Sequence, residues 1–234
     1  MNIYKTSLYL LAAGVMLAAC STDDNSGGGT NPIPENSFYN FATYNGSSDK
    51  GSSFSVQPEG DGSSATITFS NTFTDKQLTV GNRVFMAYTT MSGQQYTSGP
   101  GTLYSISNAN GGKPVAADAS NRVKVSTPIK LTEMKRTGRY LNVVFQVPAR
   151  NALNTLQLTE KPNEKEPAYP MLGLFVRTDS EQDNYKYVRV SFDVESVLEP
   201  ADVKGFKVEY FGDGGVDTLT FAKGSGTGTI VPRP

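Results

Sequence analysis

The stretch Leu141-Asn142-Val143-Val144-Phe145-Gln146-Val147 indicates the fold class, because apolar side chains fall on every second residue. Successive side chains of a β-strand point to opposite faces, so this pattern predicts a strand with one buried face. The alternation recurs at 172–176, 188–194 and 206–210, and more weakly at 153–158 and 218–221. Strands that each need one face covered are most simply accommodated in two packed sheets. We therefore predict a C-terminal β-sandwich.

The preceding half of the chain carries shorter runs of the same kind. Five segments are typical of strands: 38–44, 53–57, 65–70, 84–90 and 103–107. Turn-forming clusters such as Glu59-Gly60-Asp61-Gly62 separate them, with glycine supplying positive φ. Short strands at this density favour a small closed barrel. The predicted fold is all-β, with an N-terminal OB-like barrel followed by the β-sandwich, and helix should be scarce.

The chain divides into four predicted units. Residues 1–19 form a lipoprotein signal peptide, 20–36 a lipidated flexible tether, 37–120 the OB-like barrel domain and 121–234 the β-sandwich domain. The tether consists of small and polar residues with a single Ile33, a composition that buries too little apolar surface to order itself. The domain boundary is placed in the Gly-, Ala- and Asn-rich passage that precedes Pro128.

The N-terminus has the pattern of a bacterial lipoprotein signal. Lys5 precedes an uncharged, mostly apolar run from Leu8 to Ala19, which has the length of a signal-peptide core and is short for a membrane span. Leu17-Ala18-Ala19-Cys20 resembles a lipobox, which implies cleavage between Ala19 and Cys20 and attachment of lipid to the Cys20 thiol. Cys20 is the only cysteine, so the fold would be held without disulfides.

Three polar residues after the cysteine bear on localisation. Ser21 next to the lipidated cysteine resembles the signal for sorting to an outer membrane. Asp23 and Asp24 resemble the acidic export signal of Bacteroidota surface lipoproteins. We expect an outer-membrane protein, held to the membrane by its N-terminal lipid anchor and facing the cell exterior, with the periplasmic face as the alternative.

Two strand motifs resemble a known family. Gly81-Asn82-Arg83-Val84-Phe85-Met86-Ala87-Tyr88 resembles the G-x-R-V-x-x-x-Y strand of the NigD-like lipoproteins. Tyr140-Leu141-Asn142-Val143-Val144-Phe145 resembles their D-Y-L-N-I-x-F strand, with Arg139 where an acidic or small residue is usual. The resemblance implies a lipobox, an OB-like barrel and a β-sandwich in that order. It implies little about activity, because family members are not known as enzymes and their ligand is generally unassigned.

The residue inventory disfavours catalysis near neutral pH. The chain has no histidine, which excludes a Ser-His-Asp triad, an imidazole base and a His-based zinc site. Ser47-Ser48-Asp49-Lys50 matches S-x-x-K, but it lies in a turn-like composition and lacks a K-T-G partner. Paired carboxylates stay open, because only folding brings them together. We predict no enzymatic activity, no cofactor and no bound metal.

One acidic segment leaves a calcium site open. Asp179, Glu181 and Asp183 alternate as at the start of a calcium loop, but Asn184 and Val190 occupy positions that need Gly and Glu. A solvated hairpin turn is the favoured interpretation.

Tyrosines and cations supply the candidate ligand-binding residues. Tyr44 and Tyr104 could stack on a sugar, although tyrosine also packs well in strands. Further tyrosines at strand ends or loops are Tyr39, Tyr96, Tyr169, Tyr185 and Tyr187. Arg136 and Arg139 belong to a cation cluster with Lys130 and Lys135, which could meet phosphates or simply be solvated.

Charge and one further motif complete the candidates. The formal net charge of −1 disfavours nucleic acid as a partner. Thr218 in Asp217-Thr218-Leu219 resembles an O-glycosylation acceptor. We expect a non-catalytic binding module of the cell envelope with a protein, peptide or glycan ligand. A carboxylate-dependent hydrolase and a bacteriocin-related immunity or protease-inhibitor protein are the alternatives. The oligomeric state is not predicted.

Overall fold

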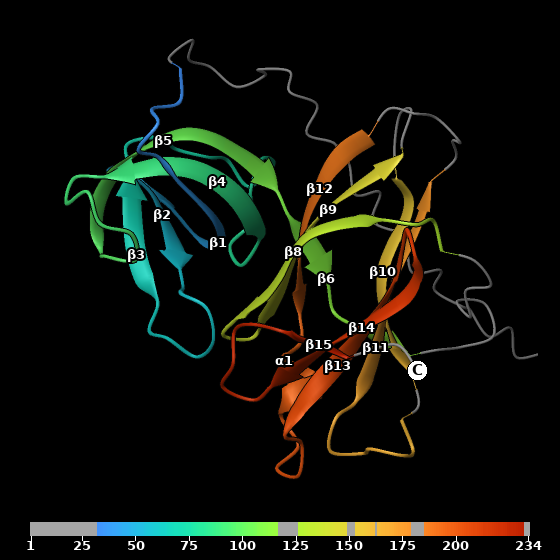
Figure 1. The fold of residues 1–234 in the computed structure, drawn as a ribbon. Coiled ribbons are helices and arrows are strands. Elements are labelled where there is room, and N and C mark those ends of the chain that lie inside the picture. The colour runs from blue at the N-terminus through green and yellow to red at the C-terminus, as the bar shows by residue number, and fades with distance from the viewer. Residues whose placement is uncertain (1–31, 117–125, 149–152, 162, 179–184, 232–234) are drawn as a thin grey trace, which may run out of the picture.

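The structure, a computed structural model, describes residues 32–116, 126–148, 153–161, 163–178 and 185–231 (Figure 1). Five N-terminal strands close into a barrel in the order β1-β2-β3-β5-β4. They are β1 (Phe38–Ser48), β2 (Gly51–Val56), β3 (Ala65–Phe69), β4 (Arg83–Thr90) and β5 (Gly99–Asn108). Antiparallel pairing of β1 with β4 closes the ring, and β3 runs parallel to β5. The predicted OB-like barrel is confirmed, and each strand predicted in this half has an observed counterpart.

Aromatic rings fill the barrel. Phe54, Phe69 and Tyr88 are almost completely buried, and the Phe69 ring lies 5.6 Å from Phe54 and 6.0 Å from Tyr88 between centroids. The β1–β2 hairpin depends on Gly51, whose φ is 116° and whose added Cβ would lie 1.9 Å from the Phe69 carbonyl oxygen. Only glycine fits there, because it tolerates positive φ and carries no side chain.

The remaining strands form two packed sheets. The strands are β6 (Asn110–Gly112), β7 (Val115–Ala116), β8 (Lys130–Thr137), β9 (Tyr140–Pro148), β10 (Leu153–Lys161), β11 (Met171–Thr178), β12 (Tyr185–Asp193), β13 (Gly205–Gly212), β14 (Gly215–Ala222) and β15 (Thr229–Val231). One sheet has the order β15-β14-β13-β11-β10-β7 and the other β6-β12-β9-β8. The alternating residues Leu141, Val143, Phe145 and Val147 are all 0% exposed, as the β9 pattern predicts. The predicted β-sandwich is confirmed.

The chain enters the sandwich earlier than predicted. Residues 110–116 were assigned to the barrel domain, but β6 pairs in parallel with β12 and β7 pairs in parallel with β10. The reason is physical: two strands of two or three residues are too short to show alternation, so the Gly- and Asn-rich segment gave no strand signal. The predicted boundary itself lies outside the described residues.

Helix is scarce in the described part of the chain, as predicted. The single described helix, α1 (Glu195–Leu198), follows β12 directly. No helix among the described residues is long and apolar enough to cross a membrane. The barrel packs beside the sheet that contains β12, β9 and β8 (Figure 1), and buried hydrogen bonds connect the two at this junction.

Candidate functional site

A buried polar network centred on Arg83 joins the barrel to the sandwich. The Arg83 side chain, on β4, is 4% exposed. Its Nε donates to Ser191 Oγ (2.9 Å), its Nη1 to Thr43 Oγ1 (2.9 Å) and its Nη2 to Asn142 Oδ1 (3.1 Å). The guanidinium carbon lies 4.0 Å from the centroid of the Tyr140 ring. All three guanidinium nitrogens therefore donate to neutral acceptors.

The same network unites the two motif strands. Arg83 comes from the G-x-R-V segment and Asn142 from the Y-L-N segment, and Ser191 Oγ also donates to Asn142 Oδ1 at 2.7 Å. Arg83 makes no ion pair within the described part of the chain. Burial lowers the pKa of Arg83 to about 10, while Tyr140 acts in the opposite direction. The guanidinium thus stays charged at neutral pH, and its role is to hold the two domains together.

The loop between β2 and β3 forms a second contact with the sandwich. Gly60 N–H donates to the Arg136 carbonyl (2.9 Å), and Gly138 N–H donates to the Gly60 carbonyl (2.7 Å). Beside them, Lys135 Nζ lies 2.5 Å from Glu59 Oε1. The hydrogen bond from Lys135 lowers the pKa of Glu59 despite partial desolvation, and the same bond raises the pKa of Lys135.

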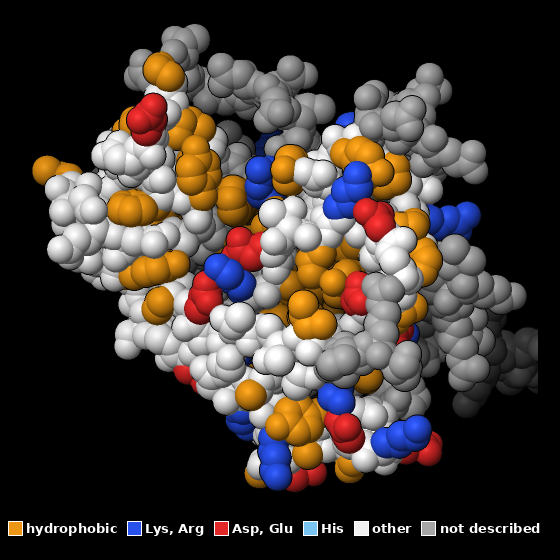
Figure 2. Space-filling model, in the orientation of Figure 1, with side chains coloured by type: hydrophobic (Ala, Val, Ile, Leu, Met, Phe, Trp, Pro, Cys, Tyr) orange, Lys and Arg blue, Asp and Glu red, His pale blue; other side chains and the backbone are white. Residues whose placement is uncertain are grey.

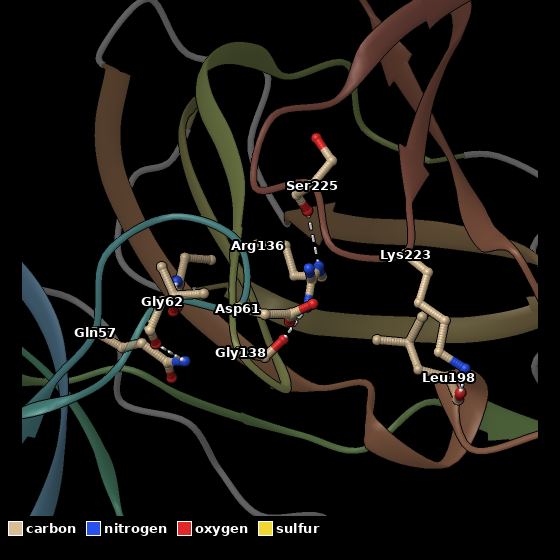
Figure 3. Close-up of polar contacts among 10 residues, drawn as sticks. Gln57, Asp61, Gly62, Arg136, Gly138, Leu198, Lys223 and Ser225 are labelled. Atoms are coloured by element: carbon tan, nitrogen blue, oxygen red, sulfur yellow. Dashed lines mark hydrogen bonds and ion pairs between the residues drawn. The ribbon is translucent and has the colours of Figure 1, made fainter.

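Arg136 lies at this second contact, where Figure 3 shows it between Asp61, Gly138 and Ser225. Its side chain is 2% exposed. Nε donates to the Ser225 carbonyl at 2.9 Å, and Nη1 donates to Asp61 Oδ1 at 2.6 Å and to the Gly138 carbonyl. Nη2 is buried and has no hydrogen-bond partner among the described residues. The Asp61 side chain, by contrast, is 59% exposed.

A small pocket opens beside Arg136. Its volume is about 230 Å³, and its charged lining residues are Asp61, Arg136, Arg139, Glu195, Glu199 and Lys223. Lys223 Nζ donates to the Leu198 carbonyl at 2.9 Å (Figure 3). The pocket is smaller than the roughly 300 Å³ at which small-molecule sites begin, and acidic and basic groups are balanced in it. We therefore do not assign the binding function to this pocket.

Arg139 is held by acidic neighbours. Its guanidinium forms ion pairs with Asp193 and, at 2.7 Å, with Glu195. The Asp193 hydrogen bond raises the pKa of Arg139 against partial desolvation. Desolvation alone would raise the pKa of Asp193, but the Arg139 hydrogen bond and the Glu195 backbone N–H together lower it. Arg139 is therefore a paired cation.

A second surface of the junction is aromatic and exposed. We name it the aromatic face and define it by Tyr39, Phe85, Lys130, Tyr185, Tyr187 and Arg189. The Tyr39 and Phe85 rings stack with centroids 6.4 Å apart, and the Arg189 guanidinium lies 4.8 Å from the Phe85 centroid. Arg189 also lies 5.6 Å from the Tyr187 ring, and Lys130 Nζ lies 3.8 Å from the Tyr185 ring. The contacts from Tyr39 through Phe85 and Arg189 to Tyr187 run from the barrel to the sandwich, and the Lys130–Tyr185 pair lies two residues further along β12.

Strand register explains this row. Tyr185, Tyr187, Arg189 and Ser191 are alternate residues of β12, so their side chains share one face of the sheet. Ser191 lies under the barrel and binds Arg83, whereas the two tyrosines are each 46% exposed. On β4, Arg83 and Phe85 alternate in the same way. Figure 2 shows hydrophobic and basic side chains next to one another across the upper part of the molecule, between the two domains.

Two of the predicted ligand-binding residues, Tyr44 and Arg136, are buried, which argues against their contact with a ligand. Tyr44 is 3% exposed, with its ring 5.2 Å from Phe54 in the barrel core and its hydroxyl 2.7 Å from Ser47 Oγ. A sugar cannot stack on it. Arg136 is equally inaccessible. Both residues lie at inward-facing positions of their strands. Side-chain direction in a strand follows the alternation of the backbone, even where a polar side chain would favour the surface.

The other predicted positions differ in their surroundings. Tyr104 is half-buried on β5, with its hydroxyl 3.3 Å from Thr89 Oγ1. Thr218 is half-buried on β14, where it pairs with Glu209 and Val231. The lipidation, cleavage and export residues Ala19, Cys20, Ser21, Asp23 and Asp24, and the calcium candidates Asp179, Glu181 and Asp183, lie outside the described residues. The described residues contain no group of three potential metal-ligating side chains.

Two central members of the aromatic face are not predictable from the sequence pattern alone. Tyr39, Tyr185, Tyr187 and Lys130 were among the candidates, but Phe85 and Arg189 were not. Alternation with the buried Val188 and Val190 could have placed Arg189 on the outer face of β12. Its contact with Phe85 depends on domain docking, which no local pattern reports.

Solved structures share this two-domain fold. A DUF1344 protein of unknown function from Bacteroides vulgatus superposes with a TM-score of 0.63 at 20% identity, over 80% of this chain and 90% of its own. A NigD-like immunity protein from Bacteroides caccae superposes with a TM-score of 0.55 at 13% identity, over 85% of this chain and 94% of its own. This chain has the NigD-like fold.

The NigD-like fold also covers a protein described as a lipoprotein. A putative lipoprotein from Bacteroides fragilis superposes with a TM-score of 0.52 at 9% identity, over 83% of this chain and 96% of its own. No family model matches the sequence, and no curated protein matches it. At these identities the comparisons show the fold, and they leave the ligand to be argued from this chain's own residues.

Proposed function

We propose that the protein is a lipid-anchored binding protein of the outer membrane, without catalytic activity, whose aromatic face captures a ligand outside the cell. The observation that carries this proposal is the aromatic face itself. Tyr39, Tyr185 and Tyr187 are 54%, 46% and 46% exposed. Arg189 and Lys130 contact aromatic rings but make no hydrogen bond or ion pair with any described residue. Aromatic and arginine side chains are the groups enriched at recognition surfaces.

Exposure of these rings to water is unfavourable in free energy, and a bound ligand would cover them. The three half-exposed tyrosines keep apolar surface in contact with water, and covering it is favourable by roughly 25 cal/mol per Å². The barrel and the sandwich each supply part of the row, so correct docking of the two domains assembles it. A binding role therefore gives a reason for the rigid Arg83 network beneath.

The binding test uses the full-length protein in detergent micelles. It would be screened against envelope polysaccharides, host glycans and peptides, with the Tyr187→Ala/Arg189→Ala double variant beside the wild type. We expect any bound ligand to lose at least about tenfold in affinity with the double variant, since two central contacts are removed.

Two matched controls make the screen decisive. Val216→Ala alters an exposed residue on the other sheet, and Tyr104→Ala removes a half-buried tyrosine on β5 that is not one of the residues that define the aromatic face. Both should bind like the wild type. Loss of binding in Tyr104→Ala but not in the double variant would contradict the proposal. Release of low-molecular-weight products from a bound polymer would show a hydrolase instead, and protection of cells from a bacteriocin would show an immunity protein.

The anchoring part of the proposal rests on the lipobox and is tested separately. Cys20→Ala should move the protein from the membrane fraction to the soluble fraction, because the lipid acceptor is lost. Replacing Asp23 and Asp24 by Ala should abolish digestion by protease added to intact cells. A Ser26→Ala variant in the same tether is the control. Unchanged membrane association of Cys20→Ala would contradict the anchor, and unchanged digestion would contradict surface display.

A further inference from the structure

We infer that the ligand of the aromatic face is a negatively charged glycan, whose sugar rings stack on the tyrosines and whose acidic groups pair with Arg189 and Lys130. This inference rests on the proposed binding function and names its ligand class. It draws on the charge of the face, the spacing of its two cations and the exposure of its tyrosines.

The charge of the face calls for an anion. Arg189 and Lys130 are each held against an aromatic ring, at 4.8 Å from Phe85 and 3.8 Å from Tyr185. A ring orients a cation through its quadrupole but leaves the N–H donors unused. Other exposed cations at the junction have acidic partners: Lys135 pairs with Glu59, and Arg139 with Asp193 and Glu195. An incoming carboxylate or sulfate would supply the acceptors that Arg189 and Lys130 lack among the described residues.

The spacing of the two cations favours a chain over a single small anion. Lys130 on β8 pairs with Gln146 on β9, and Gln146 pairs in turn with Tyr187 on β12. Arg189 is two residues beyond Tyr187 on the same strand. Two strand spacings and a two-residue step place the two backbone positions about 12 Å apart. The two cationic groups are also held against different rings, Tyr185 and Phe85, so acidic groups on separate sugar units of a polymer match them better than a single carboxylate does.

The exposed tyrosines favour sugar rings at this face. Tyr39, Tyr185 and Tyr187 are each about half exposed. The apolar faces of sugar rings stack on tyrosine while their hydroxyls remain in water. Among the described residues, β12 pairs with β6 only at Ser191 and Phe192, so an extended peptide added along the 185–190 edge is the competing ligand that the experiment tests.

The experiment compares polymers that differ only in charge. Full-length protein in micelles would be titrated with polygalacturonate and with its fully methyl-esterified form, and with chondroitin sulfate and its desulfated form. We expect at least one acidic polymer to bind and its neutral counterpart to bind at least about tenfold more weakly. Affinity should also fall as the salt concentration rises, because exposed ion pairs are screened.

Variants of Arg189 and Lys130 test whether these two residues cause the preference for acidic polymers. Arg189→Gln and Lys130→Gln should each weaken binding of the acidic polymer several-fold and leave the neutral polymer unaffected. Arg177→Gln removes an exposed positive charge from β11, on the other sheet, and should have no effect. Thermal unfolding of each variant checks that the fold is intact.

Four outcomes would overturn the inference. Equal binding of acidic and neutral polymers, or a Tyr187-dependent protein ligand, would refute the anionic glycan but leave the binding function standing. Equal binding of poly-L-glutamate would show that charge alone is recognised, without sugar stacking. Absence of any ligand that depends on Tyr187 or Arg189 would overturn the proposed function together with this inference.

Discussion

Arg83 and Arg189 lie at the same junction, each with its guanidinium over an aromatic ring, and differ in almost everything else. Arg83 is 4.0 Å from the Tyr140 centroid, is 4% exposed and donates from all three nitrogens to Ser191, Thr43 and Asn142. Arg189 lies over Phe85, is half-buried and has no hydrogen-bond partner among the described residues. The difference indicates that an arginine that is buried and fully hydrogen-bonded has a structural role. An arginine with unused donors on an exposed aromatic row is available to a ligand.

The largest expected effect comes from removing the buried member of the pair. Arg83→Ala leaves a cavity and removes the donors to Thr43, Ser191 and Asn142, and should lower the free energy of unfolding by about 3 kcal/mol. Arg189→Ala removes no hydrogen bond within the described residues and should lower it by less than about 0.5 kcal/mol. Urea unfolding followed by circular dichroism measures both. Equal losses would remove the distinction between the two arginines.

A change at Asn142 tests whether Arg83 needs a hydrogen-bond acceptor or merely a filled space. Asn142→Ala deprives Arg83 Nη2 and Ser191 Oγ of their shared acceptor, so we expect a loss of about 2 kcal/mol. Asn142→Asp keeps an acceptor and adds a charge opposite to that of Arg83, so the loss should stay below about 1 kcal/mol. The same unfolding assay compares them, and an Asp variant as unstable as the Ala variant would argue against a role for the acceptor.

Asp61 extends the comparison to Arg136, which combines burial with an acidic partner. Asp61→Asn keeps an acceptor for Arg136 Nη1 and removes a charge that is 59% exposed. Because water already screens that charge, we expect a loss of about 1 kcal/mol or less in the free energy of unfolding. Glu199→Gln, at another acid of the same pocket, is the control. A loss near 3 kcal/mol would mean that the Asp61–Arg136 pair stabilises the fold as much as the Arg83 network does.

The sequence predicts the strands better than it predicts the surface. Alternation in 141–147 identifies β9 and its buried face, because each side chain's direction follows from local backbone geometry. The same geometry buries Tyr44 and Arg136, and residue polarity misled the interpretation there. Arg136 lies two residues after the buried Met134, so strand alternation was the more reliable signal. Partners such as Phe85 and Arg189 are 104 positions apart, and their contact follows from domain docking rather than from any local pattern.

The smallest expected effect is a pH dependence at the β2–β3 loop. The Lys135 hydrogen bond lowers the pKa of Glu59 in the folded protein below its usual 4.5, so ionised Glu59 contributes stability above that pH and loses it as the pH falls through the lowered pKa. Glu59→Gln should therefore be less stable than the wild type at pH 7 and match it near pH 3. Both partners are partly exposed, so the difference at pH 7 should be only a few tenths of a kcal/mol and should shrink further in high salt. A difference that persists at pH 3 would mean that Glu59 acts through packing and not through its charge. In that case packing, and not the Glu59–Lys135 ion pair, would stabilise the contact between the β2–β3 loop and the sandwich.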